Sequence, residues 1–156
     1  MPGKYEDASL RTIKGTSPTF RNQDVYIAPS NFLRLNNAVG SGLYASRSYD
    51  KGDVIQEYIG KRLSITAANK KKTNRYMFDV KHEKKSAFVI DSYDIRNASA
   101  IRYVNSIQHE GDEKKFLNTK FVQHNKQIFL VAIKSIKKDQ EMVTYYGKFT
   151  QGIINP

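Results

Sequence analysis

The apolar residues of this chain fall in short runs of three to seven residues, separated by polar turns. The runs are rich in Val, Ile, Tyr and Phe, which favour strands, while Gly, Asp and other polar residues fill the turns. The pattern predicts β-strands over residues 25–27, 43–45, 54–59, 76–80, 87–90, 120–122 and 127–133. Many short strands with turns between them indicate a compact, mostly β fold with little helix.

Helical periodicity is scarce, and the best helix candidate covers only residues 66–72. It ends in three lysines, which suit a helix C-terminus because cations complement the helix dipole there. Residues 1–23 are polar, with glycine, proline and scattered charge, and predict a loosely ordered N-terminal arm. At 156 residues the chain fits one domain, which we place at residues 24–147, followed by a C-terminal tail at 148–156.

The composition excludes several kinds of chemistry. The chain has no cysteine, so disulfides, thiolate zinc sites and cysteine nucleophiles are excluded. His82, His109 and His124 lie in charged segments without a second ligand at metal spacing, so we expect no metal site. No serine stands in a nucleophile elbow, which argues against a serine hydrolase. No run reaches the roughly 18 apolar residues that cross a bilayer, and we expect a soluble intracellular protein without a membrane segment.

The chain is also strongly basic. It contains 26 Lys and Arg against 15 Asp and Glu, which gives a net charge of +11. Such a charge attracts acidic partners such as nucleic acid or nucleosomal DNA. A solvated, solubilising surface explains the same excess, so the charge by itself leaves the partner open.

Two local features are candidates for chemistry. The sequence Gly40-Ser41-Gly42 is a flexible turn that lacks the lysine and the following helix of a phosphate-binding loop, and by itself it is an ordinary tight turn. Among the ten tyrosines, Tyr58, Tyr76 and the pair Tyr145-Tyr146 stand at the ends of apolar runs. In isolation, such a tyrosine is a packing residue with its hydroxyl turned to water.

The order of the motifs along the chain is more informative than any one of them. The motifs are Gly40-Ser41-Gly42-Leu43-Tyr44-Ala45, Glu57-Tyr58-Ile59-Gly60, Tyr76-Met77-Phe78, Arg102-Tyr103-Val104-Asn105 and the closing stretch of residues 136–147. In this order they resemble the motif series of SET-domain protein-lysine methyltransferases, over about residues 35–147. The region around Arg102-Tyr103-Val104-Asn105 is most similar to PR domains, and the insertion at 106–115 to plant histone monomethylases.

The resemblance implies a SET fold of several small β-sheets with a pseudoknot-like threading of the C-terminal segment. It also implies S-adenosylmethionine as the cofactor, with S-adenosylhomocysteine as the product and no metal. The implied cofactor-binding residues are Val39, Gly40, Ser41, Gly42, Leu43, Tyr44, Tyr76, Arg102, Asn105 and Tyr146. In residues 39–44, it is the backbone groups that are expected to hold the cofactor.

The resemblance further implies a narrow channel for the substrate lysine. Its implied lining is Tyr58, Phe121, Thr144, Tyr145 and Tyr146, of which Tyr58 and Tyr146 are the implied catalytic residues. Phe121 and Thr144 fall where relatives carry residues that help set the number of methyl groups. Many relatives close this channel with a zinc-bound segment, and we expect residues 148–156 to close it here as a metal-free lid.

The implied substrate is a histone tail or nucleosome, which places the protein in the nucleus, or in a host nucleus if it is viral or comes from an intracellular microbe. Two alternatives stay open. One is an inactive SET-like or PR-like module that binds a protein partner, because Ser106 stands where relatives carry a histidine and Tyr145 where they carry an aspartate. The other is a basic β domain that binds nucleic acid directly through its lysines and tyrosines.

Overall fold

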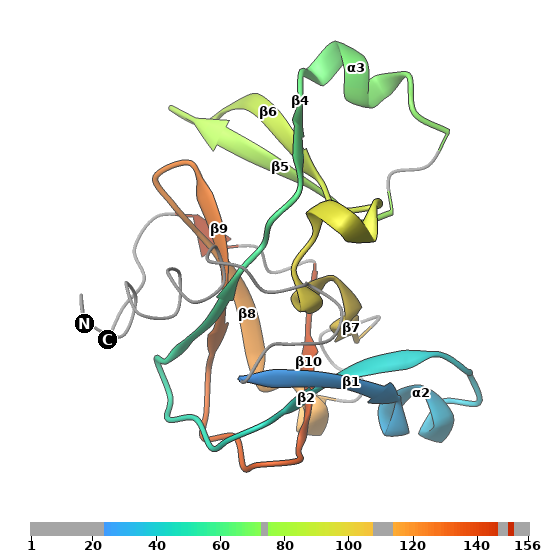
Figure 1. Cartoon of the computed structure of the whole chain (residues 1–156). Helices are drawn as coiled ribbons and strands as arrows, with labels where there is room; N and C mark the ends of the chain where they lie inside the picture. The colour runs from blue at the N-terminus through green and yellow to red at the C-terminus, as the bar shows by residue number, and fades with distance from the viewer. Residues whose placement is uncertain (1–23, 73–74, 108–113, 147–149, 152–156) are drawn as a thin grey trace.

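The computed structural model describes residues 24–72, 75–107, 114–146 and 150–151, and Figure 1 shows the whole chain. The expectations for an N-terminal arm at 1–23, and for most of the tail at 148–156, concern residues outside these ranges.

The described residues form three small β-sheets. The first has the strand order β1 (Val25–Pro29), β2 (Ser41–Ala45), β10 (Glu141–Thr144) and β7 (Asn105–Ser106). The second has the order β11 (Thr150–Gln151), β8 (Thr119–His124), β9 (Gln127–Ala132) and β3 (Val54–Glu57). The third has the order β4 (Lys61–Leu63), β6 (Lys85–Asp91) and β5 (Met77–His82).

The helices are short. Among the residues that the structure describes, two are α-helical, α2 (Asn31–Leu35) and α3 (Ile65–Asn69), and three are single 3₁₀ turns: η1 (Ile95–Asn97), η2 (Ala100–Tyr103) and η3 (Lys114–Phe116). The mostly β fold with little helix that the sequence predicts is therefore confirmed.

All seven predicted strands are present, as β1, β2, β3, β5, β6, β8 and β9. The predicted helix exists as α3, but it ends at Asn69, and the three lysines that follow it form a turn. The sequence analysis missed α2, which is too short to show a helical period. Its start is nevertheless visible locally, because the Ser30 hydroxyl caps it by accepting a hydrogen bond from the Leu33 amide at 2.9 Å.

Strand β10 lies between two strands that are far from it in sequence. It runs antiparallel to β2, with Met142 opposite Leu43, and parallel to β7, with Val143 opposite Asn105. The side chain of Asn118 adds to this ladder, since its amide accepts from the Val143 N–H at 2.8 Å and donates to the Glu141 carbonyl at 2.9 Å. Strand β10 is thus inserted between β2 and β7. This is the part of the expected C-terminal threading that lies within the described residues.

One apolar core joins the three sheets. Leu43, Ile55, Leu130 and Met142 are fully buried in it, and each such side chain contributes about 1.5–3 kcal/mol through burial. The third sheet shares this core through Val80 and Ile90 and otherwise projects from one end of the molecule (Figure 1). The ends of β3, β5 and β10 meet beside the core, and the candidate site lies there.

The segment that follows β3 passes very close to the end of β6. A Cβ atom at Gly60 would lie 2.5 Å from the carbonyl oxygen of Asp91, which no side chain tolerates. The Ser99 hydroxyl donates to the Glu57 carbonyl at 2.7 Å, and the Ser92 hydroxyl donates to the carbonyl of Ile59. The glycine of the Glu-Tyr-Ile-Gly motif therefore permits the close approach that fixes Tyr58 in place.

Strand β3 also buries polar groups without full compensation. Neither polar atom of the fully buried Gln56 amide has a hydrogen-bond partner among the described residues. Glu57 is 9% exposed; its Oε2 accepts from Gln127 at 3.0 Å, while its Oε1 has no partner. Burial raises the pKa of the Glu57 carboxyl, because the charged form loses hydration.

The raised pKa of Glu57 predicts a stability that depends on pH. Because the folded state holds this proton more tightly, its contribution is fully present below the unfolded pKa of about 4.3 and is lost as pH rises through the folded value. Glu57→Gln keeps an oxygen for Gln127 but does not titrate. We expect its free energy of unfolding to fall less between pH 4 and pH 7 than that of the wild type, measured by denaturant titration.

The exposed carboxylate of Glu83 provides the control. Glu83→Gln should keep the pH dependence of the wild type. An unchanged pH dependence in Glu57→Gln would contradict the assignment.

Candidate active site

Four aromatic rings from four separate segments meet beside the core. They belong to Tyr58 after β3, Phe78 in β5, Phe121 in β8 and Tyr146 after β10, and we call them the aromatic cluster. Ring centroids are 4.6 Å apart for Tyr58 and Phe78 and 4.5 Å apart for Phe78 and Phe121. Tyr146 stacks on Phe121 with an interplanar angle of 17° and a centroid distance of 5.9 Å. The cluster thus joins residues that are up to 88 positions apart in sequence.

The two phenols of the cluster turn their hydroxyls to backbone carbonyls. Tyr58 donates to the Tyr76 carbonyl at 2.6 Å, and Tyr146 donates to the Val104 carbonyl at 2.9 Å. Tyr58 is 2% exposed, whereas Tyr146 is 47% exposed as a residue, although its hydroxyl contact is partly buried. Burial raises the pKa of both phenols, that of Tyr146 to about 12, so both are neutral at physiological pH.

The backbone of Tyr76 is held in an unusual conformation. Its φ of 64° lies in the left-handed region, which costs a bulky residue on the order of 1–3 kcal/mol. The carbonyl of Tyr76 thereby accepts two hydrogen bonds, from the Tyr58 hydroxyl and from the Ser92 amide at 2.9 Å. The conformation therefore directs this carbonyl toward the cluster.

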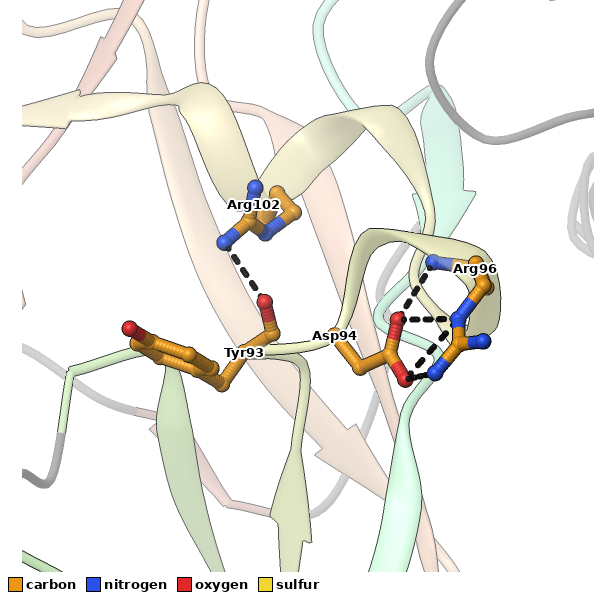
Figure 2. Close-up of polar contacts among 4 residues, drawn as sticks. All are labelled: Tyr93, Asp94, Arg96 and Arg102. Carbon is orange, nitrogen blue, oxygen red and sulfur yellow. Dashed lines mark hydrogen bonds and ion pairs between the residues drawn. The ribbon is translucent and has the colours of Figure 1, made fainter.

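Arg102 is a buried cation next to the Tyr76 ring. It is 7% exposed, and its guanidinium lies 3.9 Å from the centre of the Tyr76 ring and 4.8 Å from that of Tyr103. Its nitrogens donate to the Ser92 carbonyl at 2.8 Å and to the Tyr93 carbonyl at 3.1 Å, the contact drawn in Figure 2. A third hydrogen bond joins it to the Tyr103 hydroxyl at 2.9 Å.

No carboxylate among the described residues forms an ion pair with Arg102. The nearby Asp94 is instead engaged by Arg96, at 2.7 Å, as Figure 2 shows. Hydrogen bonds from Arg96 lower the pKa of Asp94 to about 2. A guanidinium has five N–H groups and Arg102 uses three of them, so it retains both charge and donors for an anionic group.

The sequence Gly40-Ser41-Gly42 is not the tight turn that its residues predict, because Ser41 and Gly42 begin strand β2, where Gly42 packs against the Glu141 carboxylate. A Cβ atom on Gly42 would collide with this carboxylate. Glu141 accepts from the Ser30 hydroxyl at 2.6 Å and from the Phe32 amide at 2.9 Å, and so ties the start of α2 to β10. Asn105 completes the arrangement, because its side-chain amide donates to the Ser41 carbonyl at 2.9 Å.

The predicted cofactor residues fall into three groups. Val39, Gly40 and Ser41 are exposed, and the carbonyls of Gly40 and Ser41 accept hydrogen bonds from the Ser30 amide and the Asn105 side chain, each at 2.9 Å. Leu43 is fully buried in the core, and the Tyr44 hydroxyl donates to the Pro29 carbonyl at 2.7 Å, so these two side chains are occupied by the fold. Tyr76 directly precedes β5, and Arg102 packs on its ring. Asn105 lies in β7.

The predicted channel residues also divide. Tyr58, Phe121 and Tyr146 belong to the aromatic cluster. Thr144 is fully buried and donates to the Thr119 carbonyl at 3.2 Å, and Tyr145 packs with Phe32, Ile107 and Val143 in a separate apolar cluster. Phe78 and Glu141 were quoted in the motifs without a role; the local signal for Phe78 is its place two residues after Tyr76, at the start of β5.

Ser106 takes part in placing Tyr146. Its hydroxyl accepts a hydrogen bond from the Tyr146 amide at 3.0 Å. Within the described ranges no group of three His, Asp or Glu side chains could hold a metal ion. None of the helices described there is long and apolar enough to cross a membrane.

Solved structures with the same fold include two from one human protein. The methyltransferase domain of human PR domain-containing protein 2 matches with a TM-score of 0.62 and 21% identity, over 97% of this chain and 89% of that one. The SET domain of the RIZ1 tumor suppressor (PRDM2) matches with a TM-score of 0.58 and 22% identity, over 80% of this chain and 69% of that one. ATXR5 in complex with methylated histone H3.1 matches with a TM-score of 0.64 and 22% identity, over 81% of this chain and 58% of that one.

The sequence itself matches a family model. The model of the SET domain covers residues 40–147, from Gly40-Ser41-Gly42 to the end of the closing motif. Both the fold and this match agree with the motif series, and the chain belongs to the SET domain family.

Proposed function

We propose that this protein transfers methyl groups from S-adenosylmethionine to a lysine side chain of a protein, most naturally in a histone tail. The observation that carries the proposal is the aromatic cluster, in which two neutral phenols and two phenylalanines meet. The backbone beside it is strained at Tyr76 and directs carbonyl groups at the two phenols. Membership of the SET family supports methyltransferase chemistry at this place.

The residues present fit the proposed cofactor. The segment from Val39 to Ser41 is exposed, and its end is fixed by Asn105 on the Ser41 carbonyl and by Glu141 against Gly42. Arg102 retains charge and donors for a carboxylate, which is the anionic end of an amino-acid cofactor. When bound, S-adenosylmethionine supplies a methyl group on a positively charged sulfur, which makes that carbon electrophilic.

The aromatic cluster suits a lysine acceptor for two physical reasons. An ammonium has no lone pair, so the acceptor must be neutral, and apolar rings lower its pKa because they disfavour the charged form. The rings and hydroxyls of Tyr58 and Tyr146 would hold the amine in one orientation, and positioning of this kind contributes several kcal/mol to lowering a barrier. Because both phenols are neutral, they donate or accept hydrogen bonds without acting as bases.

A histone substrate is supported by two facts. The fold of ATXR5 resembles this chain, and ATXR5 was crystallised with methylated histone H3.1. The net charge of +11 suits a protein that works beside DNA, which would place it in a nucleus.

The alternative of an inactive interaction module rests on Ser106, which stands where relatives carry a histidine. The hydrogen bond from the Tyr146 amide to the Ser106 hydroxyl favours activity, since the serine holds the backbone of the proposed catalytic tyrosine. An inactive module also has no need of a buried arginine without a carboxylate partner.

The first test removes one hydroxyl from the aromatic cluster. Tyr146→Phe should lower methyl transfer to nucleosomes or core histones by about 100-fold, as expected for loss of one well-placed hydrogen-bonding group. Its stability should change by only about 1 kcal/mol, because the ring keeps its packing. The measurement is incorporation of label from S-adenosylmethionine.

Tyr26→Phe is the matched control, because it removes an exposed hydroxyl that bonds Asp139 at 2.9 Å, away from the cluster. It should retain wild-type transfer. Cofactor binding without transfer to any histone would point to another protein substrate, and absence of both would favour the inactive module.

The second test removes the negative charge of Glu141, whose carboxylate packs against Gly42. Glu141→Gln keeps the shape but replaces charge-assisted hydrogen bonds to Ser30 and Phe32, so the Gly40-Ser41-Gly42 segment should shift. We expect the Kd for S-adenosylmethionine to rise about 10-fold in calorimetry, with the KM for the lysine substrate much less affected.

Asp139→Asn removes a carboxylate two residues away and should leave the cofactor Kd unchanged. An equal change in both variants, or a loss of stability in Glu141→Gln without a change in cofactor Kd, would show that Glu141 serves the fold alone.

A further inference from the structure

The positive charge of the chain is concentrated in one part of the fold. Residues 61–91, which comprise β4, α3, β5 and β6, contain nine Lys and Arg against three Asp and Glu. We call this segment the basic module. Its net charge is +6 out of +11, although it makes up only a fifth of the chain.

The basic module presents this charge to solvent. It projects from one end of the molecule in Figure 1 and packs on the core through Val80 and Ile90. The basic side chains are all exposed: Lys61, Arg62, Lys70, Lys71, Lys72, Arg75, Lys81, Lys84 and Lys85. They lie on β4, in the turn after α3, and around the hairpin between β5 and β6.

The acidic residues of the basic module do not neutralise it. Asp79 accepts from the Ser86 hydroxyl, Glu83 lies 3.9 Å from His82, and Asp91 accepts from the Tyr93 amide. Arg75 aside, none of the basic residues of the module forms an ion pair with a carboxylate in the part of the chain that the structure describes. Arg62 instead lies over the Phe88 ring at 4.6 Å. The module therefore keeps its positive potential.

This potential has a consequence for the substrate. A free histone tail is basic and is repelled by the module, whereas duplex DNA carries one phosphate charge per ~1.7 Å and is attracted to it. We infer that the basic module docks on nucleosomal DNA and that the acceptor lysine is taken from a chain segment lying on that DNA. The substrate part of this inference rests on the proposed function.

The fold links the proposed docking surface to the site. Strand β5 begins beside Tyr76, carries Phe78 of the aromatic cluster, and runs into the basic hairpin. DNA held by the module would therefore lie on the same sheet that carries Phe78 of the aromatic cluster. A free tail has no comparable contact and would have to approach against the charge.

The test reverses charge on the basic module. A variant with Lys70→Glu, Lys71→Glu and Lys72→Glu should bind a 20-base-pair duplex at least 10-fold more weakly than the wild type. The slope of log Kd against log salt should fall by about 3, since each lost lysine–phosphate contact removes about 1. On nucleosomes its methyl transfer should fall by a similar factor, while transfer to free histones should be unchanged or higher.

A second variant distinguishes the effect of charge from an effect of local unfolding of α3. Lys81→Glu, Lys84→Glu and Lys85→Glu make the same charge change on the hairpin and should act in the same direction. Thermal unfolding of both variants should match the wild type.

The control makes an equal charge change elsewhere. Lys134→Glu, Lys137→Glu and Lys138→Glu alter three exposed lysines around the turn before β10, at the opposite end of the molecule (Figure 1). This variant should bind the duplex and methylate nucleosomes nearly as well as the wild type.

The outcomes separate the two proposals. Equal losses in the module and control variants, no binding of the wild type to duplex DNA, or tighter binding to single-stranded RNA of equal length would overturn the docking surface. Selective loss in the module variants supports it, even if no methyl transfer is found. In that case the docking surface stands and the proposed function fails.

Discussion

The pairing of β10 on both of its edges is the constraint on which the site depends. Its antiparallel edge holds β2 and therefore the Gly40-Ser41-Gly42 segment, while its parallel edge holds β7 and therefore Asn105. The residue that leaves its end two positions later is Tyr146. A shift of one residue in this register would turn Glu141 away from this segment and Tyr146 away from Phe121, because strand side chains alternate between faces. Asn118 opposes such a shift by bonding two positions of the strand at once.

The site is also a place where the fold is under strain. Tyr76 lies in the left-handed region, and within the described part of the chain Arg102 is buried without a carboxylate partner and Gln56 with its amide unpaired. Each of these costs free energy, on the order of 1–3 kcal/mol for the backbone strain and for an unpaired buried amide. The large core shared by the three sheets offsets these costs. Such concentration of unfavourable terms near one set of rings is expected where structure serves chemistry.

The strands and the tyrosines could be predicted from the sequence because both have local signals. Alternation and β-branched residues mark the strands, and Tyr58 and Tyr146 stand in motifs whose order is recognisable. The roles of Glu141 and Phe78 could not be predicted, since each depends on contacts with residues distant in sequence. The separate packing of Tyr145, one residue before Tyr146, follows from the same cause: neighbours in an extended segment point to opposite sides. Residue type alone does not predict which side chains are buried, because Arg102 is buried and Val39 is exposed.

The attachment of the third sheet has an evolutionary consequence. Val80 and Ile90 lie in the common core and Phe78 in the aromatic cluster, whereas the charged positions of this sheet lie outside both. Substitutions at the exposed positions can therefore accumulate without disturbing the rings, the Gly40-Ser41-Gly42 segment or the threading of β10. A lineage could exchange lysines for acidic or apolar residues on this projecting sheet and acquire a new partner while keeping the same chemistry. The charged surface of the third sheet and the aromatic cluster are then free to diverge at different rates within one small domain.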